Sequence, residues 1–331
     1  MAAGLKALRK IQLGLETVPG TPVAATTRLL GQMKYDLDQK LYRAEDYDTG
    51  RLSSFERSIP VAISAKLPFE ADANYEQLAY LLGMAIKGGV AGVGGSSLYT
   101  WTYLPNLSSL NAVNTYTIQY GDDIQAFVSA FCFAQGLDLS WALDDVVKVK
   151  AALVGQTVAT TTFVGGLVFP ATLNPVITNT GKLYIDTTWA GLGGTVKAAT
   201  LLDGTWKITE GMIPIKYLDG FLWNSDKTEK KRHIELEATM AFNPNLTALW
   251  AAYTASPQTA IFVRIKFTGP VTGAGNMSLT LEGCFTIEKL PPPFEDREGQ
   301  NISKVKLVSQ YDPVSGKEWQ VVLTNAIGTL P

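Results

Sequence analysis

Alternating apolar and polar residues form strand-like segments that recur in the same order in the two halves of this chain. One segment, over 61–69, places an apolar side chain at every second position up to Phe69, and another, over 234–242, does so up to Phe242. Other paired landmarks keep the same order: Gly20-Thr21 with Gly194-Thr195, Cys132 with Cys284, Lys148-Val149-Lys150 with Lys304-Val305-Lys306, and Phe163 with Trp319. Alternation with a period of two predicts strands buried on one face. Duplication of a β-rich unit favours an architectural role, because repetition builds symmetric assemblies more readily than active sites.

Spacing between the landmarks differs where glycine or proline is dense. The first half is longer around the glycine-rich tract 88–97, which we expect to be a flexible surface loop, and the second half is longer around Pro291-Pro292-Pro293. A Gly-, Pro- and Thr-rich stretch over 165–181 separates the halves. We therefore predict two units, over 1–171 and 172–331, with the boundary near Ala171.

Most of the chain is predicted to be strand, with one helix in each half just after the Phe landmark. Asp72 is the expected N-cap of the first helix, and Asn243 or Asn245 of the second. The fold class is therefore mainly β: two tandem β-barrel or β-sandwich units, each with one short α-helix. Strands are expected at 28–34, 60–69, 116–120, 125–135, 146–155, 205–214, 233–242, 261–267, 277–287 and 303–310.

Composition excludes several classes. A hydrophobic content of 46% with 18% charged residues suits packed cores, and a net charge of -2 argues against a surface that grips nucleic acid. The two cysteines occupy matching places in the halves, so we expect reduced, packed thiols. The apolar run at the start is too short for a signal peptide, and no stretch is long enough to span a membrane. We expect a soluble protein made in a cytoplasm.

The inventory of reactive groups does not favour catalysis. His233 is the single histidine, and no cysteine or serine stands in a recognisable nucleophile context. No CxxC or HxxxH spacing suggests a metal, and the glycine-rich tract lacks the ending of a phosphate loop. We therefore expect no enzyme activity, no metal and no cofactor.

One strand face in each half is polar. Glu235 and Glu237 alternate with apolar residues, and a sequence alignment of the halves places Ala62 and Ser64 at the matching positions, with Lys66 beyond. Two interpretations are open: ordinary exposure of one sheet face, or the lining of a channel. On the second interpretation, Ser64, Lys66, Glu235 and Glu237 face the lumen, and acidic and nearly neutral sites alternate around it.

Two charged segments, over 36–57 and 217–232, are expected to form hairpins. Charges of both signs interleaved with aromatic residues suit a contact with protein better than with nucleic acid, although a solvated mobile loop is the alternative. We expect these hairpins and the chain ends, 1–10 and 313–331, to be disordered or rearranged in a free subunit. The candidate contact residues are Tyr42, Arg43, Glu45, Asp46, Arg51, Phe221, Trp223, Lys227 and Lys230.

The opening segment, Leu13-Gly14-Leu15-Glu16-Thr17-Val18-Pro19-Gly20-Thr21-Pro22-Val23-Ala24-Ala25, resembles the start of major tail tube proteins of long-tailed, non-contractile bacteriophages. Segments 183–195 and 206–208 are also similar to strand beginnings of that family. The resemblance implies a fold like that of the type VI secretion inner tube, assembled into stacked rings with six-fold symmetry. Members usually carry one such unit per chain, whereas this sequence indicates two.

The resemblance implies a structural virion protein of the tail, assembled in the host cytoplasm, whose hollow tube conducts phage DNA. Its partners would be itself, as homotrimeric rings stacked into a tube, other tail proteins such as the tape measure and the tail terminator, and DNA transiently in the lumen, with no membrane partner. A hexameric ring with a peripheral second half is the other stoichiometry. A different class also stays open: a carbohydrate-binding or adhesin-like β-sandwich, in which Trp101, Trp189 and Trp223 stack on sugars.

Overall fold

The computed structural model describes residues 4–44, 50, 52, 57–92, 97–170, 172–273 and 275–330. The fold is mainly β with an α-helix in each half, as predicted: α1 (Leu78–Ala85) and α2 (Pro244–Thr254). Short 3-10 helices, η1 (Lys6–Leu8) and η2 (Thr178–Thr180), precede the first long strand of each half. The boundary residue Ala171 lies outside the described residues, so the division into two units stays a prediction.

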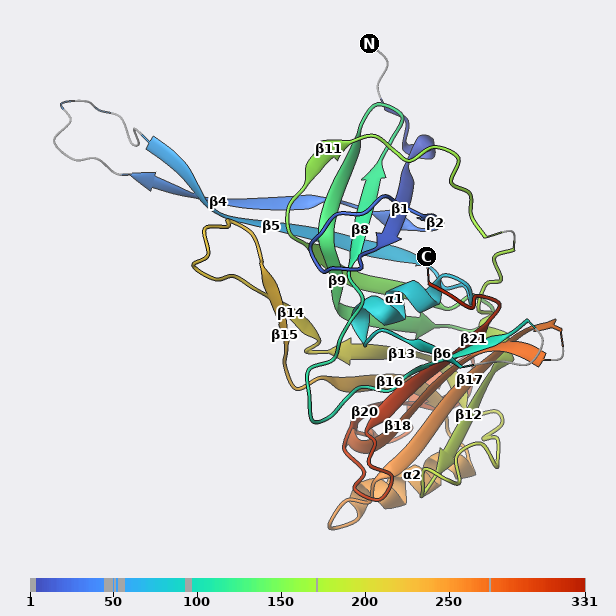
Figure 1. The fold of residues 1–331 in the computed structure, drawn as a ribbon. Coiled ribbons are helices and arrows are strands. Elements are labelled where there is room, and N and C mark those ends of the chain that lie inside the picture. The colour runs from blue at the N-terminus through green and yellow to red at the C-terminus, as the bar shows by residue number, and fades with distance from the viewer. Residues whose placement is uncertain are drawn as a thin grey trace.

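A curved antiparallel sheet runs through both halves (Figure 1). Its strands pair in the order β4 (Asp36–Ala44), β5 (Arg57–Asp72), β10 (Lys148–Gly155), β9 (Ala126–Trp141), β13 (Leu201–Thr209), β16 (His233–Ala241), β20 (Gln300–Ser309) and β18 (Gly275–Lys289). β3 (Gln32–Met33) also pairs with β5, ahead of β4 in the chain. The first four strands of this order come from the first half and the last four from the second, and the two sets have the same internal arrangement.

Each half is closed by a second layer. In the first half β1 (Lys10–Leu15), β2 (Thr27–Leu29), β8 (Tyr116–Gly121) and β11 (Ala159–Thr161) join the early part of β9. In the second half β12 (Gly181–Asp186), β17 (Ile261–Thr272) and β21 (Trp319–Asn325) join the early part of β18. The long strands β9 and β18 therefore pass from one layer to the other. Two smaller pairings lie outside these layers: β14 (Met212–Ile215) with β15 (Asp226–Glu229), and β19 (Glu295–Arg297) with β20.

The alternating sequence pattern sets the core. Along β5, Ala65, Leu67 and Phe69 are buried while the residues between them are exposed. The same alternation along β16 buries Ile234, Leu236 and Ala238. Side chains of both halves belong to one continuous hydrophobic core. The two cysteines are free and buried, as expected.

The two helices are stabilised by different local interactions. At α2 the prediction is confirmed, because the side chain of Asn243 accepts hydrogen bonds from the backbone N–H groups of Asn245 and Leu246. At α1 the predicted N-cap is wrong. Asp72 ends β5, the helix begins at Leu78, and its N-cap residue Gln77 makes no side-chain capping bond. Every residue of α1 is buried, so packing stabilises it, and the Asn74 side chain accepts a hydrogen bond from the Gln77 N–H in the turn just before the helix.

Two segments predicted to be loose are ordered. Part of the glycine-rich tract forms β6 (Val90–Gly92), which pairs with β7 (Tyr99–Tyr103). β7 in turn pairs with β21, so an insertion of the first half extends a sheet of the second. The C-terminal region 313–331 is expected to be disordered or rearranged in a free subunit, yet within it β21 is a core strand that buries Trp319, Val321 and Leu323. Those three residues alternate, which is the signal that should have identified the strand.

We expect Trp206→Ala to destabilise the whole chain. Trp206 is fully buried and meets the Phe285 ring edge-on, with the ring centroids 5.6 Å apart. Its truncation should lower the free energy of unfolding by about 3–5 kcal/mol, measured by denaturant titration. Phe294→Ala, at a side chain that is 84% exposed, is the matched control and should change stability by less than about 0.5 kcal/mol. Two separate transitions, of which only one shifts, would contradict the continuity of the core.

Candidate functional site

The strand pair β9–β13 joins the two halves within the chain. In this antiparallel pair Leu137 lies opposite Ile208, and Trp141 lies opposite Gly204. The close approach at Gly204 requires glycine, because a Cβ there would lie 2.7 Å from the Trp141 ring. β9 is paired on its other side with β10, and β13 with β16, so the sheet passes through this joint without a break.

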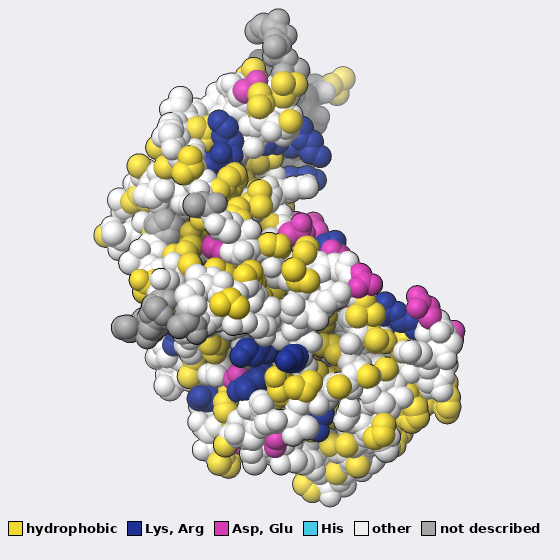
Figure 2. Space-filling view, turned by 90° about the vertical axis from the view of Figure 1, so that its right-hand side faces the viewer, with side chains coloured by type: hydrophobic (Ala, Val, Ile, Leu, Met, Phe, Trp, Pro, Cys, Tyr) yellow, Lys and Arg dark blue, Asp and Glu magenta, His cyan; other side chains and the backbone are white. Residues whose placement is uncertain are grey.

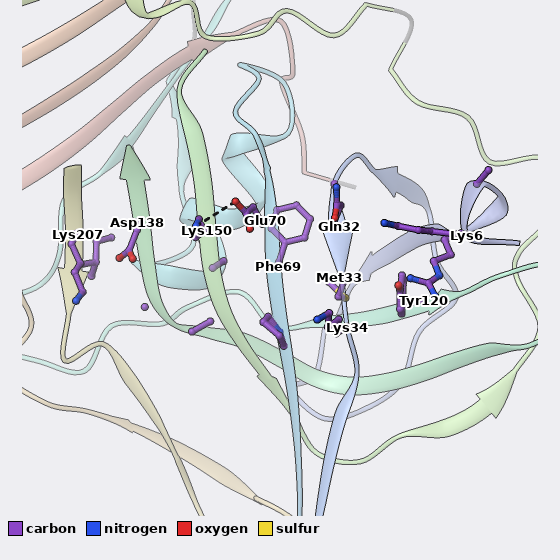
Figure 3. A pocket seen from close by; sticks show the side chains of 18 residues that line it. Lys6, Gln32, Met33, Lys34, Phe69, Glu70, Tyr120, Asp138, Lys150 and Lys207 are labelled. Carbon is purple, nitrogen blue, oxygen red and sulfur yellow. Dashed lines mark ion pairs between the residues drawn. The ribbon is translucent and has the colours of Figure 1, made fainter. Parts of the chain in front are cut away.

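The polar face of this sheet carries charges that alternate in sign from strand to strand (Figure 3). Lys150 lies opposite Glu70 on one side, with a Nζ–Oε1 distance of 3.3 Å, and opposite Asp138 on the other. Beyond the joint, Lys207 lies opposite both Asp138 and Glu235. In order across the sheet, the charged row consists of Glu70, Lys150, Asp138, Lys207, Glu235, Lys306 and Glu288.

Alternation continues at the far end of the charged row. The Nζ atom of Lys306 lies 3.9 Å from an oxygen of Glu235 and 2.8 Å from one of Glu288. Asp138 therefore has a lysine on each side, whereas Glu288, at the edge of the sheet, has one on a single side. Opposite charges on neighbouring strands stabilise the pairing, and like charges would oppose it.

Two members of the charged row have shifted pKa values: the contact with Glu288 raises the pKa of Lys306, and the pKa of Asp138 is raised as well. Desolvation raises the pKa of its carboxyl group, and the charges of Lys207 and Lys150 partly oppose that rise. The carboxyl lies in the middle of the sheet, next to the joint. Its ionised form is therefore disfavoured by partial burial and supported by lysines from both halves.

The sequence-predicted lining residues lie on this same face. Glu237 is exposed opposite Thr205 and Lys306, and Glu235 is half-buried next to Lys207. Ser64 and Lys66 lie on the polar face of β5, opposite Asp38 and Asp36 of β4. Whether any of them lines a lumen stays a prediction.

Strand register corrects the alignment of the two halves. Glu70 lies opposite Lys150 in the first half as Glu237 lies opposite Lys306 in the second. The counterpart of Glu237 is therefore Glu70, and not Ser64. Because side chains alternate with a period of two, an alignment that slips by an even number of residues keeps the same face and looks equally good. In this register Glu70 and Pro68 take the places of Glu237 and Glu235, so both halves carry an acid at one of the two positions, and the alternation around a lumen stays a prediction.

A hollow of about 1110 Å³ lies over the first-half part of this face. Lys150, Asp138 and Lys207 lie on the sheet side, while Lys6 and Tyr120 stand beyond Gln32 and Lys34 of the β3 region (Figure 3). In the side view, both basic and acidic side chains follow the concave edge of the molecule (Figure 2). The hollow itself has more basic than acidic side chains, since Lys6, Arg9, Lys34, Lys150 and Lys207 line it together with Glu70 and Asp138.

The main sheet ends in two open edges. At one end β3 and β4 pair with β5 alone among the described strands. At the other end, residues 286–289 of β18 pair with β20, and no described strand pairs with them on the opposite side. There the side-chain amide of Gln258 donates to the Ile287 carbonyl over 2.9 Å. A backbone strand could displace that side chain.

Both predicted hairpins exist in the structure. The β4–β5 hairpin extends away from the body (Figure 1), and Tyr42 on it is 58% exposed. Arg43 is also exposed on this hairpin, whereas Glu45, Asp46 and Arg51 lie outside the described residues. The loop of the β14–β15 hairpin meets the base of the first, because the Ile63 N–H donates to the Leu222 carbonyl over 2.7 Å.

The other hairpin candidates divide into exposed and packed residues. Phe221 and Trp223 form an aromatic pair with ring centroids 5.2 Å apart, and Lys230 is exposed. Lys227 instead places its Nζ atom 4.9 Å from the centre of the Phe131 ring, and burial lowers the pKa of its ammonium group. Lys227 therefore contacts its own chain.

The described residues give little support to a sugar-binding surface built on Trp101 or to a metal site. Trp101 is buried, with its indole N–H bonded to Asn325 and Ile327, so it cannot stack on a sugar as the binding-module alternative required. No cluster of metal-ligating side chains occurs within the part of the chain that the structure describes. Over the same residues, neither helix is long and apolar enough to cross a membrane.

No protein-family model matches this chain, and a search of curated proteins finds none that is significantly similar.

We expect the Asp138 carboxyl to titrate at higher pH than the Asp145 carboxyl. Carbon-detected NMR of the two carboxyl groups over a pH series measures this. Burial raises the pKa of Asp138, whereas a backbone hydrogen bond from Val146 lowers that of Asp145. Lys207→Gln should raise the pKa of Asp138 further, because it removes a favourable charge, and should leave Asp145 unchanged. Equal titration of the two carboxyls would contradict the burial of Asp138 at the joint.

The same shift predicts the direction of a pH effect on stability. The folded chain holds the Asp138 proton more tightly than the unfolded chain does, because its pKa is raised above 3.8. This carboxyl therefore contributes stability that is present at acidic pH and lost as pH rises through the folded pKa. Asp138→Asn should remove that loss from the stability profile, measured by denaturant titration at several pH values.

Proposed function

We propose that this chain is a structural subunit that polymerises into a hollow tube of stacked rings, the tail tube of a long-tailed phage. The observation that carries the proposal is the β9–β13 joint, through which two sets of strands with the same order form one curved sheet. A sheet built by repeating one joint continues until it closes on itself, and closure removes the open edges. The resemblance of the opening segment to tail tube proteins supports the same function.

The repeat also indicates which edges would meet between copies. Gln32 lies opposite Glu70 as Thr205 lies opposite Glu237, so Lys34 of one half corresponds to Lys207 of the other. At the far edge β18 is irregular, and Lys289 is the residue directly opposite Lys306. Glu288 follows Ile287 as Asp138 follows Leu137 and makes the ion pair with Lys306, so we infer that Glu288 takes the place of Asp138. We infer that Glu288 of one copy meets Lys34 of the next, as Asp138 meets Lys207 within the chain. The charged row would then continue around the ring.

Stoichiometry follows from the two strand sets in each chain. If the ring has six sets, as the family resemblance implies, three chains close it with pseudo-six-fold symmetry. The head-to-tail contact is heterologous, and such contacts give closed rings when the rotation between units divides a full turn. The exposed β4–β5 hairpin and the β14–β15 loop are then available for contacts between rings.

The charged row suits a passage for DNA. Acids and lysines alternate at close range, so a phosphate backbone meets no continuous basic surface from which it could release counterions. Weak attraction between the charged row and the phosphate backbone lets the DNA slide along the tube. On this proposal the face with Glu235 and Glu237 lines the lumen, the partners are further copies, tape measure and terminator proteins, the location is the virion tail, and the protein has no enzyme activity.

Purified protein should form rings or filaments under the electron microscope, and each ring should contain three chains by native mass spectrometry. The reason is that each chain already contains one of the joints between strand sets. A ring mass equal to six chains would contradict the three-chain arrangement. A protein that remains monomeric at every concentration, salt and seeding condition would contradict the proposed function itself.

Charge reversal tests the contact between copies. Lys34→Glu or Glu288→Lys alone should raise the protein concentration needed for assembly roughly three- to tenfold, because each places like charges on paired strands. The double variant should recover much of the loss, because it restores an opposite pair. Lys182→Glu, an equal charge change on β12 away from both edges, is the matched control and should assemble normally. Independent, additive losses in the double variant would contradict the pairing.

A further inference from the structure

The far edge of the main sheet carries a backbone carbonyl that points away from the sheet. The Cys284 carbonyl accepts a hydrogen bond from the Gln310 N–H over 2.9 Å, so it points toward the β20 side of β18. Backbone groups of an antiparallel strand turn alternately to its two sides, so the Ile287 carbonyl, three residues later, points to the other side. There β17 pairs with β18 only as far as Phe285, and no described strand pairs with residues 286–289. An unpaired edge of this kind is a template for pairing with another chain.

One side chain covers this carbonyl. The amide nitrogen of Gln258 lies 2.9 Å from the Ile287 carbonyl oxygen and 3.5 Å from the carbonyl oxygen of Tyr253, in the last turn of α2. Gln258 is half-buried and belongs to the turn 255–260, which connects α2 to β17. A side-chain amide group has two N–H donors, so it can serve both carbonyls. The Gln258 side chain thus donates to the sheet edge as a backbone N–H of a further strand would.

The first half has a strand at the equivalent place. Ile287 lies opposite Leu307 of β20, just as Leu137 lies opposite Ala151 of β10. On its other side Leu137 lies opposite Ile208 of β13, within the joint. At the far edge the Gln258 side chain therefore lies on the side that a backbone strand occupies at the joint.

We propose that Gln258 is a removable cover of this edge, which β3 of a neighbouring copy displaces when two copies join. The inference rests on the proposed head-to-tail assembly and adds a control to it. In the free chain the Ile287 carbonyl already has a partner, so joining breaks that bond before the backbone bonds between copies form. The occupant is a second copy, because Glu288, next to this carbonyl, has a lysine on its inner side only and meets Lys34 of that copy.

A glutamine is suited to such a cover. Its amide is neutral and has the same donor as a peptide group, so it satisfies the carbonyl about as well as a strand does at one position. It supplies one hydrogen bond, whereas an incoming strand supplies several along the edge. A complete strand can therefore displace it, while a short or mismatched segment gains too little. The cover would thus reduce pairing with unrelated chains more than pairing with another copy.

Replacement of the amide tests the cover. Gln258→Met removes both donors and keeps the length and volume of the side chain. The protein concentration needed for assembly should fall about two- to tenfold, because the incoming strand no longer displaces a hydrogen bond of ordinary net strength. Sedimentation of assembled material over a dilution series measures this. Thr259→Ala, at an exposed residue of the same turn, is the matched control and should assemble as the unchanged protein does.

A purely structural role of Gln258 predicts a different result. If the amide only supports the turn after α2, Gln258→Met should assemble at the same or a higher concentration than the unchanged protein. That outcome would overturn the inference and leave the proposed function intact. Failure of the unchanged protein to assemble under every condition would overturn both.

A second measurement needs no variant. In an electron cryo-microscopy map of assembled rings of the unchanged protein, the Ile287 carbonyl should accept from a backbone N–H of the neighbouring copy, with the Gln258 amide moved away. A Gln258 amide that still contacts Ile287 in the assembled ring would contradict the displacement.

Discussion

The antiparallel pairing of β9 with β13 fixes how the two halves lie relative to each other. Backbone hydrogen bonds of a sheet set both distance and direction, so a joint of this kind leaves little freedom for one half to rotate against the other. Trp141 over Gly204 and Lys207 beside Asp138 then fit only in one register. The curvature of the sheet, the continuity of the core and the position of the two open edges all depend on this pairing.

The alternating charges on the polar face serve register more than stability. Lys150, Glu70, Lys304 and Glu295 are well exposed, and exposed ion pairs of this kind contribute little to folding. A slip of the joint by two residues would nevertheless place Asp138 opposite Thr205 or Thr209 and separate it from Lys207, so only the correct register keeps this opposite pair. A pattern with a period of two cannot by itself exclude a slip by two residues, although the close approach of Trp141 to Gly204 opposes one. The charged face adds to that discrimination.

Much of the fold could be predicted from alternation, and the failures have physical reasons. The strand that contains Phe69 has one buried face and shows the matching alternation, whereas the strands around Cys132 and Cys284 are apolar and buried on both faces. The pairing of β9 with β13 was not, since no sequence pattern says which strand lies beside which. Asp72 was misplaced because a capping residue can equally end a strand, and α1 is stabilised by burial on all sides. The equivalence of Glu70 with Glu237 needed strand register, which a period of two cannot define by itself.

Having both strand sets on one polypeptide changes how an assembly would begin. The β9–β13 joint forms inside a single molecule, where the second partner is present at an effective concentration on the order of millimolar or above, whatever the dilution of the protein. Half of the joints in the proposed ring would then require no encounter between molecules. The remaining joints alone would respond to the amount of protein made, so the onset of assembly would depend on fewer collisions than in a ring of single units.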